Sequence, residues 1–114
     1  MNPAEGTTVL GKTIQLHGEI TGAEEMFIDG KFQGSIHLTA SRLVLGPNAE
    51  VDAELQVQDL IVLGRHHGSV TATGRVELRQ NAELIGDITA ARLSIEESAL
   101  LRGRVTLTGQ ESRG

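Results

Sequence analysis

Apolar and polar residues alternate with a period of two in short stretches along most of this chain. Leu60 and Val62 alternate with polar or outward positions, and Val76 and Leu78 repeat the alternation after a corner that contains Gly64. Stretches of about five residues with this period are typical of short strands that bury one face. The pattern therefore predicts an all-β chain of short strands joined by tight corners.

The strands recur at a nearly constant distance of about 17 residues, which indicates a repeat architecture. One column of equivalent positions is small at every level: Gly18, Gly34, Ala53, Gly68, Gly86 and Gly103. Two residues further on the column is aliphatic: Ile20, Ile36, Leu55, Val70, Ile88 and Val105. A third column, also apolar, comprises Val9, Met26, Leu43, Leu60, Val76 and Leu93. Agreement between several columns defines a repeating unit.

A repeat of about 17 residues without helical periodicity matches one coil of a triangular β-solenoid. Stacked coils place equivalent residues about 4.8 Å apart on parallel strands. We predict a single-domain parallel β-helix of about six coils over residues 9–107. Flexible tails are expected at residues 1–8 and 108–114, which are short, polar and unpatterned.

Composition excludes several classes of function. The net charge of −5 argues against nucleic-acid binding, which requires a cationic surface. The chain has no cysteine and therefore no disulfide. No apolar run approaches the length of a spanning helix, and the start lacks a signal-peptide pattern. We expect a cytoplasmic protein.

Residues with chemical potential are few, and none is arranged as a reactive site. No nucleophile–base pair and no phosphate-binding loop is recognisable, so we expect neither catalysis nor a cofactor. His66 and His67 should point to opposite faces of a strand, which disfavours a shared metal ion. His66 falls at an inward position that other levels fill with Leu, Phe or Val. We expect it to find a backbone partner at a corner or to tilt outward.

The ends of such a solenoid expose unpaired backbone groups and apolar side chains unless capping units cover them. The polar segment after Leu107 cannot form an amphipathic cap. The sequence therefore predicts end-to-end stacking into a filament. The predicted contact at the C-terminal end comprises Leu93, Ile95, Leu100, Leu101, Val105 and Leu107. The predicted contact at the N-terminal end comprises Val9, Leu10, Ile14, Leu16 and Ile20. The alternative is a monomer or dimer whose short tails fold over the ends.

The ordered series of motifs resembles the bactofilin domain over about residues 10–107. The resemblance begins at Gly18-Glu19-Ile20 and continues through Phe27-Ile28-Asp29-Gly30-Lys31-Phe32. It ends in Ala99-Leu100-Leu101-Arg102-Gly103-Arg104-Val105. The resemblance implies a right-handed triangular β-helix that polymerises without nucleotide into a cytoskeletal scaffold. It also implies head-to-head and tail-to-tail contacts, and hence a non-polar filament.

Two positions depart from the bactofilin pattern. Many bactofilins have an aromatic residue near the C-terminal end, where this chain has Leu101. Bactofilins also often bind membrane through an apolar and basic N-terminal tail. The corresponding residues here are Met1, Val9, Leu10 and Lys12, which predict at most a weak contact with the inner face of the cell membrane.

Two other classes of protein fit part of the pattern. A left-handed β-helix transferase of the hexapeptide-repeat type has a similar coil, but it repeats strictly in sixes and needs an active-site loop. A small adaptor module could recruit client proteins along the faces of the rod. Fibres without nucleotide would favour the filament, and discrete trimers would favour the transferase.

Overall fold

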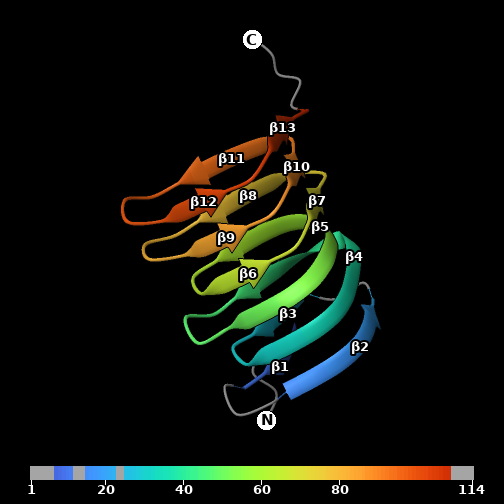
Figure 1. The fold of residues 1–114 in the computed structure, drawn as a ribbon. Coiled ribbons are helices and arrows are strands. Elements are labelled where there is room, and N and C mark those ends of the chain that lie inside the picture. Colours follow the sequence, from blue (N-terminus) through green and yellow to red (C-terminus); the bar gives the residue numbers. More distant parts are fainter. Residues whose placement is uncertain (1–6, 12–14, 23–24, 109–114) are drawn as a thin grey trace.

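The computed structural model describes residues 7–11, 15–22 and 25–108 of the chain, and within these residues all regular structure is β-strand. Every strand pairing among them is parallel. Figure 1 shows the chain winding upward in successive coils, with equivalent strands stacked above one another. The predicted all-β solenoid is confirmed.

The strands of the described residues form three ladders that run along the solenoid. The first contains β6 (Arg65–His67), β9 (Glu83–Ile85) and β12 (Leu100–Arg102). The second contains β7 (Val70–Ala72), β10 (Ile88–Ala90) and β13 (Val105–Leu107). The third contains β1 (Thr7–Leu10), β3 (Glu25–Ile28), β8 (Arg75–Leu78) and β11 (Arg92–Ile95). Long strands bend across ladders: β2 (Gln15–Thr21), β4 (Lys31–Leu45) and β5 (Glu50–Val62).

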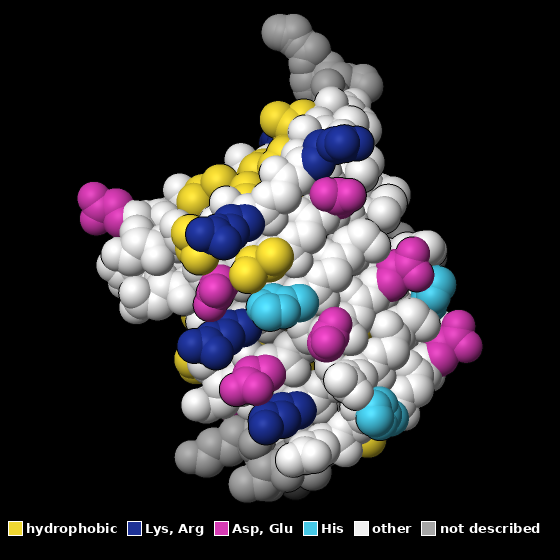
Figure 2. Space-filling model, viewed as in Figure 1, with side chains coloured by type: hydrophobic (Ala, Val, Ile, Leu, Met, Phe, Trp, Pro, Cys, Tyr) yellow, Lys and Arg dark blue, Asp and Glu magenta, His cyan; other side chains and the backbone are white. Residues whose placement is uncertain are grey.

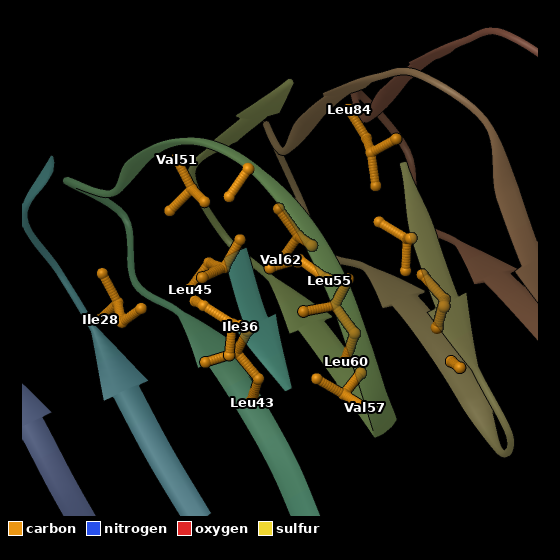
Figure 3. Packing of buried hydrophobic residues seen from close by; sticks show 14 of the residues in the cluster. Ile28, Ile36, Leu43, Leu45, Val51, Leu55, Val57, Leu60, Val62 and Leu84 are labelled. Atoms are coloured by element: carbon orange, nitrogen blue, oxygen red, sulfur yellow. The ribbon is translucent and has the colours of Figure 1, made fainter. Parts of the chain in front are cut away.

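The observed register reproduces most of the columns predicted from the sequence. Ile20 pairs with Ile36, and the same column continues without a slip to Val105. About five turns separate its first and last members. Because side chains alternate between the two sides of a strand, the inward columns fill the interior with aliphatic groups. Figure 3 shows Ile28, Leu45 and Val62 from successive levels within this core.

The small column forms one corner of the solenoid. Its five glycines have φ between 127° and 147°, a conformation that side chains rarely adopt. At Gly86 a Cβ would lie 2.7 Å from the carbonyl carbon of Gly68 on the level below. The five positions with positive φ therefore favour glycine for their dihedral angles, and Gly86 also needs it for the close approach of the level below. Ala53 lies outside this φ region.

At other corners, acidic side chains accept hydrogen bonds from residues of the next level. Asp29 accepts hydrogen bonds from the backbone N–H of Asn48, at 2.9 Å, and from its side-chain amide, at 3.1 Å. Asp59 accepts one from the backbone N–H of Arg75, at 2.9 Å. These bonds satisfy backbone groups that leave the strand ladders at the corners.

The column predicted from Val9 is wrong by one residue. The prediction placed Val9 beside Met26 and hence Gly11 beside Ile28, whereas Thr8 pairs with Met26, Val9 with Phe27 and Leu10 with the core residue Ile28. No described residue lies beneath the first level, so the alternation alone does not decide which residue of the Val9-Leu10 pair has the inward register.

Candidate functional site

The C-terminal end of the solenoid presents unpaired strand edges. Among the described residues β11 pairs only with β8, β12 only with β9 and β13 only with β10. The opposite edge of each strand therefore has free N–H and C=O groups that another parallel or antiparallel strand could bind.

The inward columns end at this surface in aliphatic side chains. Ile95 is 48 % exposed, whereas Leu78 directly beneath it is fully buried. Leu107 is 59 % exposed above the fully buried Ala90, and Val105 is 36 % exposed. Figure 2 shows hydrophobic side chains gathered at this end of the molecule. The last level is thus a cross-section of the core that no further level covers among the described residues.

The remaining residues predicted at this end have different environments. Leu93 and Leu101 are half-buried and pack against the core. Leu101 continues the inward column above Leu84. Leu100 belongs to an outward column, above Glu83, so its side chain lies on the flank of the first ladder and is 44 % exposed. The C-terminal set is thus brought together on the last level, with Leu100 at its rim.

The N-terminal end is less apolar in the described residues. β1 pairs only with β3, and β2 only with β4, so the lower edges of both strands have no partner there. Leu16 is 39 % exposed and Ile20 is half-buried. Leu10 occupies an inward register position below Ile28, whereas the register of Val9 is outward. Ile14 lies outside the described residues, as do Met1 and Lys12 of the predicted membrane contact.

His66 differs from what the sequence suggested. It does not tilt outward: its side chain is 0 % exposed, between Val51 and Leu84, with the backbone of Gly68 and Ser69 nearby, and neither ring nitrogen has a partner in good hydrogen-bond geometry. Burial lowers the pKa of His66 to about 4, and the neighbouring His67 acts in the same direction. Asp52 and backbone groups of Gly68 and Ser69 oppose this shift without completing a hydrogen bond of good geometry. The ring is therefore neutral at pH 7.

The flanks of the solenoid are charged but contain no recognisable reactive centre. Lys31 pairs with Glu50 at 3.9 Å, and Arg65 pairs with Glu83 at 3.4 Å, along one outward column of the first ladder. Positive and negative side chains alternate on this face in Figure 2. Within residues 7–11, 15–22 and 25–108 no three His, Cys, Asp or Glu side chains cluster as metal ligands would. The two ends, rather than a pocket, are the notable surfaces.

Comparison with known proteins gives consistent matches. The family described as Bactofilin, polymer-forming cytoskeletal, matches residues 8–106. Bactofilin BacO of Myxococcus xanthus (strain DK1622) is 36 % identical over 104 residues, covering 91 % of this chain and 82 % of BacO. BacP of the same strain is 36 % identical over 100 residues, covering 88 % of this chain but only 41 % of BacP.

A solved structure matches as well. The solid-state NMR structure of the cytoskeletal bactofilin BacA superposes with a TM-score of 0.80 at 27 % identity, covering 93 % of this chain and all of the BacA chain. No helix in the described part of this chain is long and apolar enough to cross a membrane.

Proposed function

The chain belongs to the bactofilin family of polymer-forming cytoskeletal proteins, and we propose that it assembles end to end, without nucleotide, into filaments that act as a scaffold. Family membership favours this function over that of a hexapeptide-repeat transferase. An adaptor role is compatible with it, because client proteins could bind the flanks of an assembled rod.

The observation that carries the proposal is the uncovered last level. Ile95, Val105 and Leu107 sit at the tops of columns whose lower members are buried, so a second copy stacked there would bury them too. Completing the burial of a half-exposed aliphatic side chain contributes about 1 kcal/mol. Pairing the free edges of β11, β12 and β13 would add backbone hydrogen bonds.

We propose that the filament is non-polar, with like ends meeting. A contact of C-terminal end with C-terminal end is isologous, so each exposed aliphatic side chain contributes on both sides of the junction. Leu10, Leu16 and Ile20 would form the second contact, between N-terminal ends, where the described residues offer fewer aliphatic side chains. We therefore expect the C-terminal junction to be the stronger of the two.

The test is replacement of Leu107 by Arg. Leu107 is already 59 % exposed, so the change should leave the folded subunit intact, whereas it would bury a charge at the junction. Negative-stain microscopy without nucleotide should show long fibres for the parent protein. The variant should give short species held together only by N-terminal contacts, with a correspondingly smaller sedimentation coefficient.

Thr106→Arg is the matched control, because Thr106 lies on the same strand and faces outward. It should assemble like the parent. Leu101→Arg is a less clean variant, because Leu101 packs against the core and its loss could unfold the subunit. Fibres of Leu107→Arg that match those of the parent in length would refute a junction at this end.

A cytoplasmic location, with weak attachment to the inner face of the membrane, completes the proposal. The apolar and basic N-terminal residues Met1, Val9, Leu10 and Lys12 support it. Flotation with anionic vesicles tests it, and Lys12→Glu should reduce the bound fraction. Equal flotation of that variant would remove Lys12 from the contact.

A further inference from the structure

One row of outward side chains on the third ladder is apolar. Phe27, Val44 and Ile61 pair with one another in register on β3, β4 and β5. Each lies between two buried core residues of its strand, so its own side chain points away from the interior. All three are only half-buried. We call these three residues the lateral row.

The lateral row contrasts with the other flanks at the same levels. Along β5 the outward residues of the first two ladders are polar: Glu50, Asp52, Glu54 and Gln56. The apolar outward residue Ile61 appears only after the strand has turned onto the third ladder. Higher on this ladder the row becomes polar again, with Glu77 and then Ser94. The apolar surface is therefore local to the lower part of one flank.

Phe27 is held in place at the edge of this surface. A Cβ on Gly46 would lie 2.8 Å from Cζ of Phe27, so the ring reaches over the corner that Gly46 forms on the next level. The chain has only two phenylalanines, and the other, Phe32, is buried in the core. An aromatic ring already held in one position loses little entropy when a partner covers it.

The neighbouring outward row identifies the partner. Its charges alternate in sign over four levels, through Glu25, Arg42, Asp59 and Arg75, and the alternation ends at Arg92 on the level above. When these four positions are taken in reverse order, each level has a charge of the opposite sign. A second copy, related by a two-fold axis parallel to the strands and between the levels of Arg42 and Asp59, would match it. Arg42 would then face Asp59 of the other copy, and Glu25 would face Arg75 of the other copy.

The same rotation brings the apolar side chains together. Val44 would face Ile61 of the other copy, and Ile61 would face its Val44, so four aliphatic side chains would meet at the centre. Apolar groups at the centre with charged groups beside them are typical of protein interfaces. The surface is thus complementary to itself in charge at the four charged positions and in hydrophobicity at Val44 and Ile61, whereas Phe27 would face Glu77 of the other copy.

We propose that the lateral row and the adjacent charged row form a contact through which two filaments pair side by side, with the facing copies antiparallel. This inference rests on the filament proposed above. A contact of so few side chains is weak between single copies, because stable interfaces bury far more surface. Copies linked into a filament present it repeatedly, so the pairing becomes strong only after end-to-end assembly.

The experiment compares Ile61→Lys with Gln56→Lys, an outward residue of the same strand on another ladder. High-speed sedimentation reports filaments, low-speed sedimentation reports bundles, and microscopy gives the fibre width. Ile61→Lys should keep filaments in the high-speed pellet while the low-speed pellet falls several-fold. Gln56→Lys should match the parent. Circular dichroism melts verify folding, and Ile61→Thr, which keeps the β-branched shape, replaces the lysine variant if that variant is unfolded.

Arg42→Glu tests the predicted register, since it places a carboxylate opposite Asp59 of the other copy. Its ion pair with Glu25 is on the surface, so its loss should leave the fold stable. Loss of bundles with retained filaments supports the antiparallel match, whereas undiminished bundles in this variant or in Ile61→Lys overturn it. A parent that forms only single filaments overturns the lateral contact and leaves the end-to-end proposal standing. A parent without filaments overturns both.

Discussion

Acid should destabilise the solenoid through His66, and replacement of this residue should remove the effect. The imidazole is completely buried in an inward column, and neither nitrogen has a hydrogen-bond partner. Protonation would place an unpaired charge among aliphatic side chains, which is why burial lowers the pKa to about 4 from the ordinary value of 6.5. His66→Val would instead match the Val51 on the level below.

The magnitude follows from the two pKa values. In the unfolded chain the ring takes up its proton near pH 6.5, whereas in the folded chain it stays neutral until about pH 4. Between these values the unfolded state binds more protons, so the free energy of unfolding falls as the pH falls. The expected loss is about 2 kcal/mol between pH 7 and pH 5, and about 3 kcal/mol once the pH is below 4.

Urea unfolding followed by circular dichroism measures this loss. The Leu107→Arg background is preferable, because assembly would add its own stabilisation to the subunit. Comparison of pH 7 with pH 5 avoids most of the titration of ordinary carboxylates. His66→Val should be at least as stable as its parent at pH 7 and should lose the drop of about 2 kcal/mol. His67→Gln, at the exposed neighbouring position, should retain most of that drop.

Two outcomes would refute the reasoning. A clear loss of stability in His66→Val at pH 7 would mean that the imidazole makes a stabilising hydrogen bond. Equal pH dependence in His66→Val and its parent would mean that other groups cause the acid sensitivity.

Two further predictions concern the corners. Gly86→Ala should destabilise the subunit by at least about 2 kcal/mol, because the new Cβ meets the Gly68 carbonyl in a strained conformation. Gly22→Ala is the control, since its Cβ has room, and equal melting temperatures for the two variants would contradict the argument. Asp29→Ala should cost about 1 kcal/mol by removing both hydrogen bonds from Asn48, and Asp29→Asn, which keeps an acceptor, should cost less. Urea midpoints measure this pair, and equal midpoints would show that the corner does not depend on the bond.

The repeat made most of the fold predictable, because equivalent residues on successive levels face the same way, either into the core or away from it. The column from Ile20 to Val105 was therefore correct throughout its length. The first level was not, since Val9 and Leu10 have no lower neighbour among the described residues to decide which of them has the inward register. The buried ring of His66 was also beyond sequence reasoning, because hydrogen-bond geometry depends on backbone positions.

The candidate surfaces were predictable to different degrees. Most of the C-terminal surface follows from the columns, because the last member of an inward column must be at the end. Leu100 was included for its hydrophobicity, although its column is outward. The lateral row could not be predicted from the sequence, for a related reason. Met26, Phe27 and Ile28 form a continuous apolar run, and such a run does not reveal which of its members leaves the core.

The repeated glycine corner has a consequence for the size of the subunit. Since successive turns bend in a similar way, the cross-section is nearly constant. The packing of each level against its neighbours therefore does not depend on the total number of turns. A turn could be inserted or deleted midway while both terminal surfaces kept their composition. The length of the subunit can thus change in steps of about 4.8 Å without changing the side chains that form the end-to-end contacts. Along a polymer, the number of repeats alone would fix the spacing of attached cargo.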